Sequence, residues 1–203
     1  MKRKRSGIPA GPAAAFVGLR NERVWALQLS AGAGGNFGTW GPAEQLRLVL
    51  LDETGVEFVQ FKELPHLLMP PVSAPERKAG AMLALCMELQ WRYSVFAKCG
   101  ARELEDYNQQ AETPLPHIVA VIDGLEDLLA QKECVGQIQQ ICQKGRPAGI
   151  HIIAAARQVP EEEIIAGFAS RLAFRRGGGG GNKERGKPVG APGAELLPIP
   201  GTA

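Results

Sequence analysis

Residues 115–123 read Leu-Pro-His-Ile-Val-Ala-Val-Ile-Asp, an apolar run that follows a proline and ends on a carboxylate. A short, continuous apolar run between such residues is typical of a strand that is buried on both faces of a parallel sheet. Similar runs recur along the chain. We therefore expect strands at Val24–Ser30, Leu46–Leu51, Glu57–Phe61, His117–Ile122, Ile150–Ala155 and Arg171–Arg175.

Helical patterns alternate with these runs. The longest extends from about Ala74 to Lys98, where apolar residues recur at steps of three and four. Ser73 and Glu76 predict a capping box at its start, and Gly100 predicts its end. Shorter helices are expected at Leu125–Ala130, Glu133–Lys144 and Glu161–Phe168. This alternation predicts an α/β fold, with a mainly parallel central sheet flanked by helices.

The composition suits one folded domain with two tails. Of 203 residues, 45% are hydrophobic, while 25 Gly and 15 Pro indicate segments without regular structure. We expect a basic, Ala/Gly/Pro-rich flexible leader over residues 1–20, the domain over 21–176, and a Gly/Pro-rich disordered tail over 177–203. No apolar run approaches the ~20 residues of a membrane helix. The four cysteines form no CxxC pair, which favours reduced thiols and a cytoplasmic location.

The net charge of +2 conceals basic ends on an acidic middle. The basic residues that we single out as candidate DNA contacts are Lys2, Arg3, Lys4 and Arg5 at one end and Arg175 and Arg176 at the other. Such ends suit contact with a polyanion, and they equally suit solubility alone.

Two features point toward a nucleotide. The candidate nucleotide-binding residues form one glycine-rich stretch: Gly32, Ala33, Gly34, Gly35, Asn36, Phe37, Gly38 and Thr39. A glycine-rich turn after a strand can aim backbone N–H groups at a phosphate, although such clusters also simply make turns. Asp123 ends an apolar strand, where a carboxylate can hold a magnesium-bound water or serve as the N-cap of the next helix.

Many short stretches, taken in order, resemble the FtsK/SpoIIIE family of DNA translocases. They are Leu48–Asp52, Val56–Phe58, Leu64–Leu68, Trp91–Arg102, Tyr107–Asn108, Leu115–Asp123, Ala148–Ile153 and Ser170–Arg175. The resemblance covers roughly residues 27–176 and implies a RecA-like P-loop domain. It further implies ATP and Mg²⁺ as cofactors, with Thr39 and Asp123 beside the metal. The implied partners are double-stranded DNA and further subunits of a hexameric ring that moves DNA during chromosome segregation, cell division or sporulation.

The departures from the family pattern affect the positions that bind phosphate and activate water. The family's glycine loop ends in Gly-Lys-Ser/Thr, whereas Phe37-Gly38-Thr39 lacks the lysine that meets the phosphates. The family has Asp-Glu at the strand end, and here Gly124 follows Asp123, so the water-activating Glu is missing. The sensor strand is also altered, at residues 155–159. Finally, the six residues between Thr39 and Leu46 are too few for a crossover helix, so we expect that helix to be deleted.

The sequence therefore predicts a catalytically impaired translocase-family ATPase domain. The alternative is a non-enzymatic pseudo-ATPase that acts as an interaction or non-specific DNA-binding module through its basic tails. Weak nucleotide binding and a gene product without selected activity also remain open. Arg92 and Arg102 are expected to face DNA, a neighbouring subunit or solvent, and the three histidines are not expected to share a metal.

Overall fold

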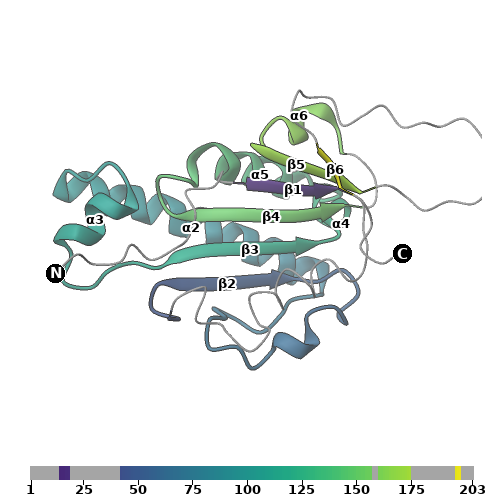
Figure 1. The fold of residues 1–203 in the computed structure, drawn as a ribbon, viewed down its shortest axis with the longest axis horizontal. Coiled ribbons are helices and arrows are strands. Elements are labelled where there is room, and N and C mark those ends of the chain that lie inside the picture. The colour runs from purple at the N-terminus through teal and green to yellow at the C-terminus, as the bar shows by residue number, and fades with distance from the viewer. Residues whose placement is uncertain (1–13, 19–41, 157–159, 175–194, 198–203) are drawn as a thin grey trace, which may run out of the picture.

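The computed structural model describes residues 14–18, 42–156, 160–174 and 195–197. Its centre is a six-stranded sheet in the order β2-β3-β4-β1-β5-β6, in which every neighbouring pair is parallel (Figure 1). The strands are β1 (Ala14–Gly18), β2 (Leu46–Leu51), β3 (His117–Asp123), β4 (Ile150–Ala156), β5 (Ser170–Phe174) and β6 (Glu195–Leu197). Because all strands run the same way, their carboxyl ends meet at one edge of the sheet.

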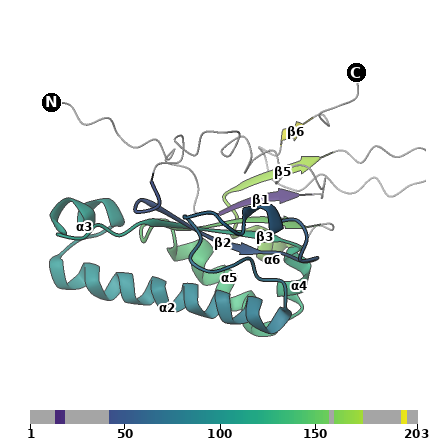
Figure 2. The same cartoon turned by 90° about the horizontal axis from the view of Figure 1, so that it is seen from below.

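Helices cover one face of this sheet. They include α2 (Pro75–Cys99), α4 (Leu125–Leu129) and α5 (Lys132–Lys144), and Figure 2 shows α2 as the outermost of them. Two shorter helices are α3 (Leu104–Gln110), which follows α2, and α6 (Glu162–Ile165), which precedes β5. The main core lies between α2, α5 and the sheet, and includes Met82, Leu85, Leu89, Ile138, Ile141 and Ile152.

A long loop after β2 covers part of the opposite face. It includes the 3₁₀ helix η2 (Val59–Phe61), and it buries Phe58 and Phe61 against Leu48, Leu50 and Val121. The loop then returns along the free edge of β2, where the Leu48 N–H donates to the His66 carbonyl at 2.8 Å. This pairing satisfies backbone groups that an open sheet edge would otherwise expose.

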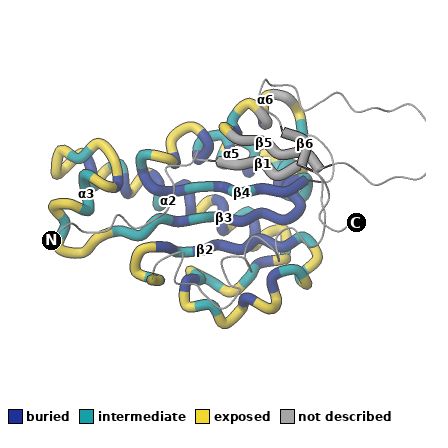
Figure 3. Tube along the Cα trace, viewed as in Figure 1, coloured by how far each residue is buried: buried dark blue, intermediate teal, exposed yellow. Residues whose placement is uncertain are grey.

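Several predictions from the sequence are confirmed. The α/β class and the parallel sheet are as expected, and β2, β3, β4 and β5 lie within a residue of their predicted ranges. The helix α2 ends where expected, because Gly100 adopts φ 75°, in the left-handed region that glycine enters without steric cost. Figure 3 shows the carboxyl halves of β3 and β4 as buried, as their continuous apolar sequence predicts.

Other predictions need correction. Glu57–Phe61 is not a strand, because the three-residue spacing of Phe58 and Phe61 places both rings on one side of a helical turn. The capping box is absent, since α2 begins at Pro75 with Ala74 as N-cap and without a side-chain cap. The helix α6 is shorter than predicted, and α3 was not predicted.

Two strands lie where the sequence indicates only tails. Residues 1–20 were expected to be a flexible leader, yet Ala14–Gly18 forms β1 between β4 and β5. Residues 177–203 were expected to be disordered, yet Glu195–Leu197 pairs with β5 as β6. Neither run is long or strongly β-forming, so pairing with its neighbours outweighs local preference. The predicted strand Val24–Ser30 lies outside the described residues.

Within the described residues, no helix combines the length and the apolarity needed to cross a bilayer.

Candidate functional site

Asp123 lies at the carboxyl edge of the sheet, which is where ligands bind in parallel α/β folds. Its side chain is only 2% exposed, at the last residue of β3 and in register with Ala155 of β4. It does not cap the following helix, because the N-cap of α4 is Gly124. The alternative role that the sequence left open for Asp123, as an N-cap, is therefore wrong.

The carboxyl end of β1 lies at the same edge, one strand beyond β4. Gly18 is in register with Ala156, so β1 and β3 flank β4 at about 10 Å from one another by ordinary strand spacing. The chain that leaves β1 therefore starts beside the strand that carries Asp123. The predicted nucleotide-binding residues Gly32–Thr39 belong to this connection and lie outside the described residues.

The position of β1 changes the basis of one expectation from the sequence, but does not test it. The deletion of the crossover helix was inferred by taking Val24–Ser30 as the strand before the glycine-rich stretch. With β1 at Ala14–Gly18, the connection to β2 spans residues 19–45. This length exceeds the dozen residues that a parallel crossover needs, but only six residues separate Thr39 from Leu46, so the loss of a helix after the glycine-rich stretch stays a prediction.

Gly124, the residue after Asp123, differs from the family's glutamate in backbone conformation and available space as well as in chemistry. Gly124 adopts φ 75°, and a Cβ atom added to it would lie 2.7 Å from Glu53 Cβ and 2.8 Å from Glu53 Oε2. Real Cβ contacts are not that short, so Glu53, just after β2, fills the space of a side chain at position 124. A glutamate could not be placed at position 124 without moving the β2–η2 loop.

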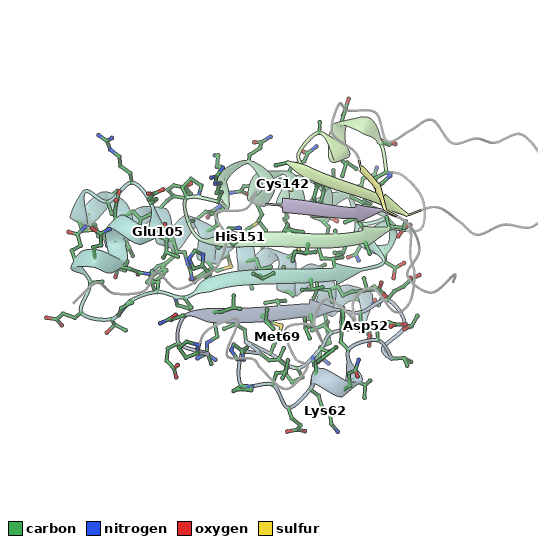
Figure 4. The ribbon with its side chains drawn as sticks, viewed as in Figure 1. Asp52, Lys62, Met69, Glu105, Cys142 and His151 are labelled. Atoms are coloured by element: carbon green, nitrogen blue, oxygen red, sulfur yellow. The ribbon has the colours of Figure 1, made fainter. Side chains whose placement is uncertain are left out.

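The adjoining Asp52 has a structural role. Its Oδ1 accepts hydrogen bonds from the Thr54 N–H at 3.0 Å and the Thr54 hydroxyl at 3.3 Å, and its Oδ2 accepts from the Phe58 N–H at 3.1 Å. Figure 4 shows Asp52 at the carboxyl end of β2. Asp52 thereby fixes the loop that carries Glu53 against Gly124.

The described residues at this edge are predominantly acidic. Asp52 and Glu53 follow β2, Asp123 ends the neighbouring strand β3, and Glu126 and Asp127 lie in the first turn of α4. A basic side chain nearby, that of the buried Lys78, is already paired with Asp127 Oδ2 at 2.9 Å. This pair links α2 to α4 and leaves the excess of carboxylates in place.

The described residues at this edge fit a metal ion only if a bound phosphate ligand supplies part of its coordination shell. Among the described residues, no three His, Cys, Asp or Glu side chains are grouped to hold a metal. Magnesium in nucleotide sites needs no such group, because phosphate oxygens and waters complete its shell around one or two carboxylates. Asp123 fits the role of that carboxylate, and Thr39 is not described.

A second polar cluster lies at the opposite, amino-terminal end of the strands. His117 Nδ1 is 3.4 Å from His151 Nε2, and His117 Nε2 is 3.6 Å from Glu105 Oε1. Figure 4 shows Glu105 and His151 at this end. Burial, more than the charge of Arg92, lowers the pKa of His117, while Glu105 opposes the change. The histidines 34 residues apart are thus neighbours, although no metal group forms among the described residues.

Arg92 is buried, so the expectation that it faces DNA, a neighbouring subunit or solvent is wrong. It is 1% exposed, donates from Nε to Glu88 at 2.8 Å, and donates from Nη1 to the Ala148 carbonyl at 2.7 Å. This arginine therefore ties α2 to the segment before β4 and cannot reach DNA or a neighbouring subunit. Arg102 is exposed, as expected.

Comparison with known proteins gives one consistent result. The model of the FtsK/SpoIIIE family matches residues 40–161, which is more than half of the chain. The chain belongs to the FtsK/SpoIIIE family. A curated relative, the DNA translocase FtsK of Helicobacter pylori, is 34% identical over 147 residues, which are 67% of this chain and 17% of the relative. The chain thus spans less than a fifth of the length of that relative.

Solved structures agree with the fold expected for the FtsK/SpoIIIE family. The cytoplasmic domain of the Type VII secretion ATPase EccC from Thermomonospora curvata superposes with a TM-score of 0.63 at 21% identity, over 78% of this chain and 19% of that one. The pCW3 conjugation coupling protein TcpA, in a monomer form with ATPγS, gives 0.66 at 14% identity, over 80% of this chain and 48% of that one. The domain is therefore RecA-like, as the resemblance implies.

The structure brings together only part of the site that the sequence predicts. Asp123 and Gly124 lie at the expected edge of this FtsK/SpoIIIE-family fold. The glycine-rich stretch and the basic residues Lys2–Arg5, Arg175 and Arg176 lie outside the described residues. Sequence analysis missed Glu53, although a glutamate directly after the strand next to Asp123 could have signalled it.

Proposed function

We propose that this chain is a catalytically impaired domain of a DNA-translocase assembly, which binds ATP weakly and does not hydrolyse it. The observation that carries the proposal is the pair Asp123-Gly124, where Glu53 fills the space that the family's glutamate needs. One ligand-binding carboxylate is retained, and the group that would activate the attacking water is absent.

The phosphate side of the site supports the same proposal. No Gly-Lys-Ser or Gly-Lys-Thr sequence occurs anywhere in the 203 residues. Removing one partner of a buried, hydrogen-bonded charge pair costs about 2–5 kcal/mol in binding, or about one to four orders of magnitude. The carboxylates at this edge would also repel a polyphosphate. We therefore expect binding in the millimolar range where a competent P-loop site would give micromolar binding.

The assembly and location are proposed from the family alone. By analogy with DNA translocases, the domain would act in the cytoplasm, on double-stranded DNA, within a homo- or hetero-oligomeric ring whose other subunits hydrolyse ATP. The basic residues Lys2–Arg5, Arg175 and Arg176 suit the DNA contact by charge.

A second candidate function is a non-enzymatic interaction or DNA-binding module. The acidic carboxyl edge favours it, because this edge offers no basic side chain among the described residues at positions 50–54 and 121–130, and the nearby Lys78 is paired with Asp127. This candidate predicts that nucleotide has no effect on the domain.

Calorimetric titration with Mg·ATP separates these functions. For the proposed function, we expect millimolar binding that needs Mg²⁺ and is lost in Asp123→Asn, a variant of nearly unchanged size. Micromolar binding would contradict the proposed impairment. Complete absence of binding at millimolar ATP would favour the second candidate.

A further inference from the structure

The outward face of α2 is apolar along most of its length. Leu83, Met87 and Trp91 recur at steps of four residues and are 51%, 62% and 47% exposed. Figure 2 shows α2 at the outside of the helical layer, away from the sheet. These side chains therefore face outward, unlike Met82, Leu85 and Leu89, which face the core.

The well-exposed residues around these three carry no charge, and the carboxylate of Glu88 beside them, 33% exposed, accepts a hydrogen bond from Arg92. Between Arg77 and Lys98, the exposed residues of α2 are Gly80, Leu83, Ala84, Met87, Gln90, Trp91, Ser94 and Ala97. A helix that covers a core usually bears charged residues on its outer face, and a helix that is apolar all round is usually buried. The steps of three, four and seven residues on this face are those of a seam between two helices.

We propose that this face pairs α2 with α2 of a second copy of this chain, antiparallel and symmetric about Met87. At 100° per residue, positions at equal distances before and after Met87 lie at mirror angles on the helix. A two-fold axis through Met87 therefore places Leu83 against Trp91, and Gly80 against Ser94. The small residue at each of these outer positions allows the two helices to approach closely.

The charged residues at the two ends of this face favour a second copy of the chain over an unrelated apolar partner. Glu76 and Lys98 are both exposed and lie eleven residues on either side of Met87, within about 20° of its direction. The antiparallel pairing places each Glu76 opposite Lys98 of the other copy, so that opposite charges meet at both ends. A parallel pairing would place Glu76 against Glu76 and Lys98 against Lys98.

The size of the face sets the expected affinity. From Glu76 to Lys98 the helix extends about 33 Å, and it is about 10 Å wide. This area is smaller than the ~800 Å² per partner of a standard interface. We therefore expect a reversible dimer with a dissociation constant in the micromolar range.

Sedimentation velocity over a micromolar concentration series tests the contact with the full chain. We expect a monomer–dimer equilibrium for the wild-type protein and a monomer for Met87→Lys, which places two lysines together at the axis. Val59→Lys is the matched control, since Val59 is 51% exposed but lies on η2, and it should dimerise as the wild type does. A wild-type monomer at every concentration, or an undiminished Met87→Lys dimer, would overturn the proposal.

Charge exchange at the ends tests the antiparallel arrangement. Glu76→Lys and Lys98→Glu should each raise the dissociation constant by at least about fivefold, because each creates two like-charged pairs. The double variant should return to within about twofold of the wild type. Single variants without effect, or a double variant weaker than both, would overturn the antiparallel register.

Discussion

The clearest effect of a single residue concerns His117. Its pKa is lowered from the ordinary value of 6.5 by burial, with Arg92 acting in the same direction and Glu105 opposing it. His151 is its other polar neighbour, at 3.4 Å. Below pH 6.5, His117 of the unfolded chain binds a proton while His117 of the folded chain stays neutral. The free energy of unfolding therefore decreases as the pH falls.

We therefore expect the thermal midpoint to fall between pH 7 and pH 5, and to fall less in His117→Gln. Differential scanning calorimetry at both values, on both proteins, measures this difference. If the variant loses as much stability as the wild type, His117 is not the responsible group.

Residue chemistry was only partly predictable from the sequence. The place of Asp123 followed from one apolar strand that ends in a carboxylate. The burial of Arg92 did not, because an arginine at an apolar position of α2 has the same local sequence whether its partner is solvent or the Ala148 carbonyl. That partner lies 56 residues away and becomes visible only in the fold.

At the scale of elements, the β2–η2 loop and the β3–α4 turn fit together through Glu53 and Gly124. Gly124→Ala should lower the free energy of unfolding by about 2–4 kcal/mol, from left-handed strain and overpacking against Glu53. In a Glu53→Gly background only the strain remains, so the cost of the same substitution should be smaller by at least about 1 kcal/mol.

Urea denaturation of the four proteins in this double-mutant cycle gives the coupling. Gly136→Ala is the control, because a Cβ there would meet no atom within 4 Å, and it should not destabilise the protein in either background. An equal cost of Gly124→Ala with and without Glu53 would show that the two loops do not press on one another.

Elements were predictable where the sequence is continuous and strongly apolar. This holds for β2, β3, β4 and the buried face of α2. The strand β1 was not predictable, because its sequence Ala-Ala-Phe-Val-Gly is short and follows a proline-rich start. Its pairing with β4 and β5 stabilises it as a strand. The sequence also could not show that the chain returns along the edge of β2 after η2.

For the whole molecule, DNA binding is expected to be non-specific and sensitive to salt. Because β1 and β6 lie within the two predicted tails, substitution tests this better than truncation does. Replacing Lys2–Arg5, Arg175 and Arg176 with glutamine should abolish binding to duplex DNA in fluorescence anisotropy. Partial replacements should reduce the log–log salt slope by about 0.9 for every phosphate that the protein no longer neutralises.

The control replaces exposed basic residues of the folded domain, Lys62, Arg102, Lys132 and Lys144, with glutamine. We expect this variant to bind as the wild type does. Loss of binding in the control, with retention in the first variant, would move the DNA site onto the domain.

The central claim is that this FtsK/SpoIIIE-family domain keeps the fold and one carboxylate of an ATPase without its catalytic activity. Phosphate release by the purified full chain, with Mg·ATP and saturating duplex DNA, tests it most directly beside Asp123→Asn. The account predicts equal rates for the two proteins, at the level of a blank without protein. DNA-stimulated release by the wild type that disappears in Asp123→Asn would contradict it.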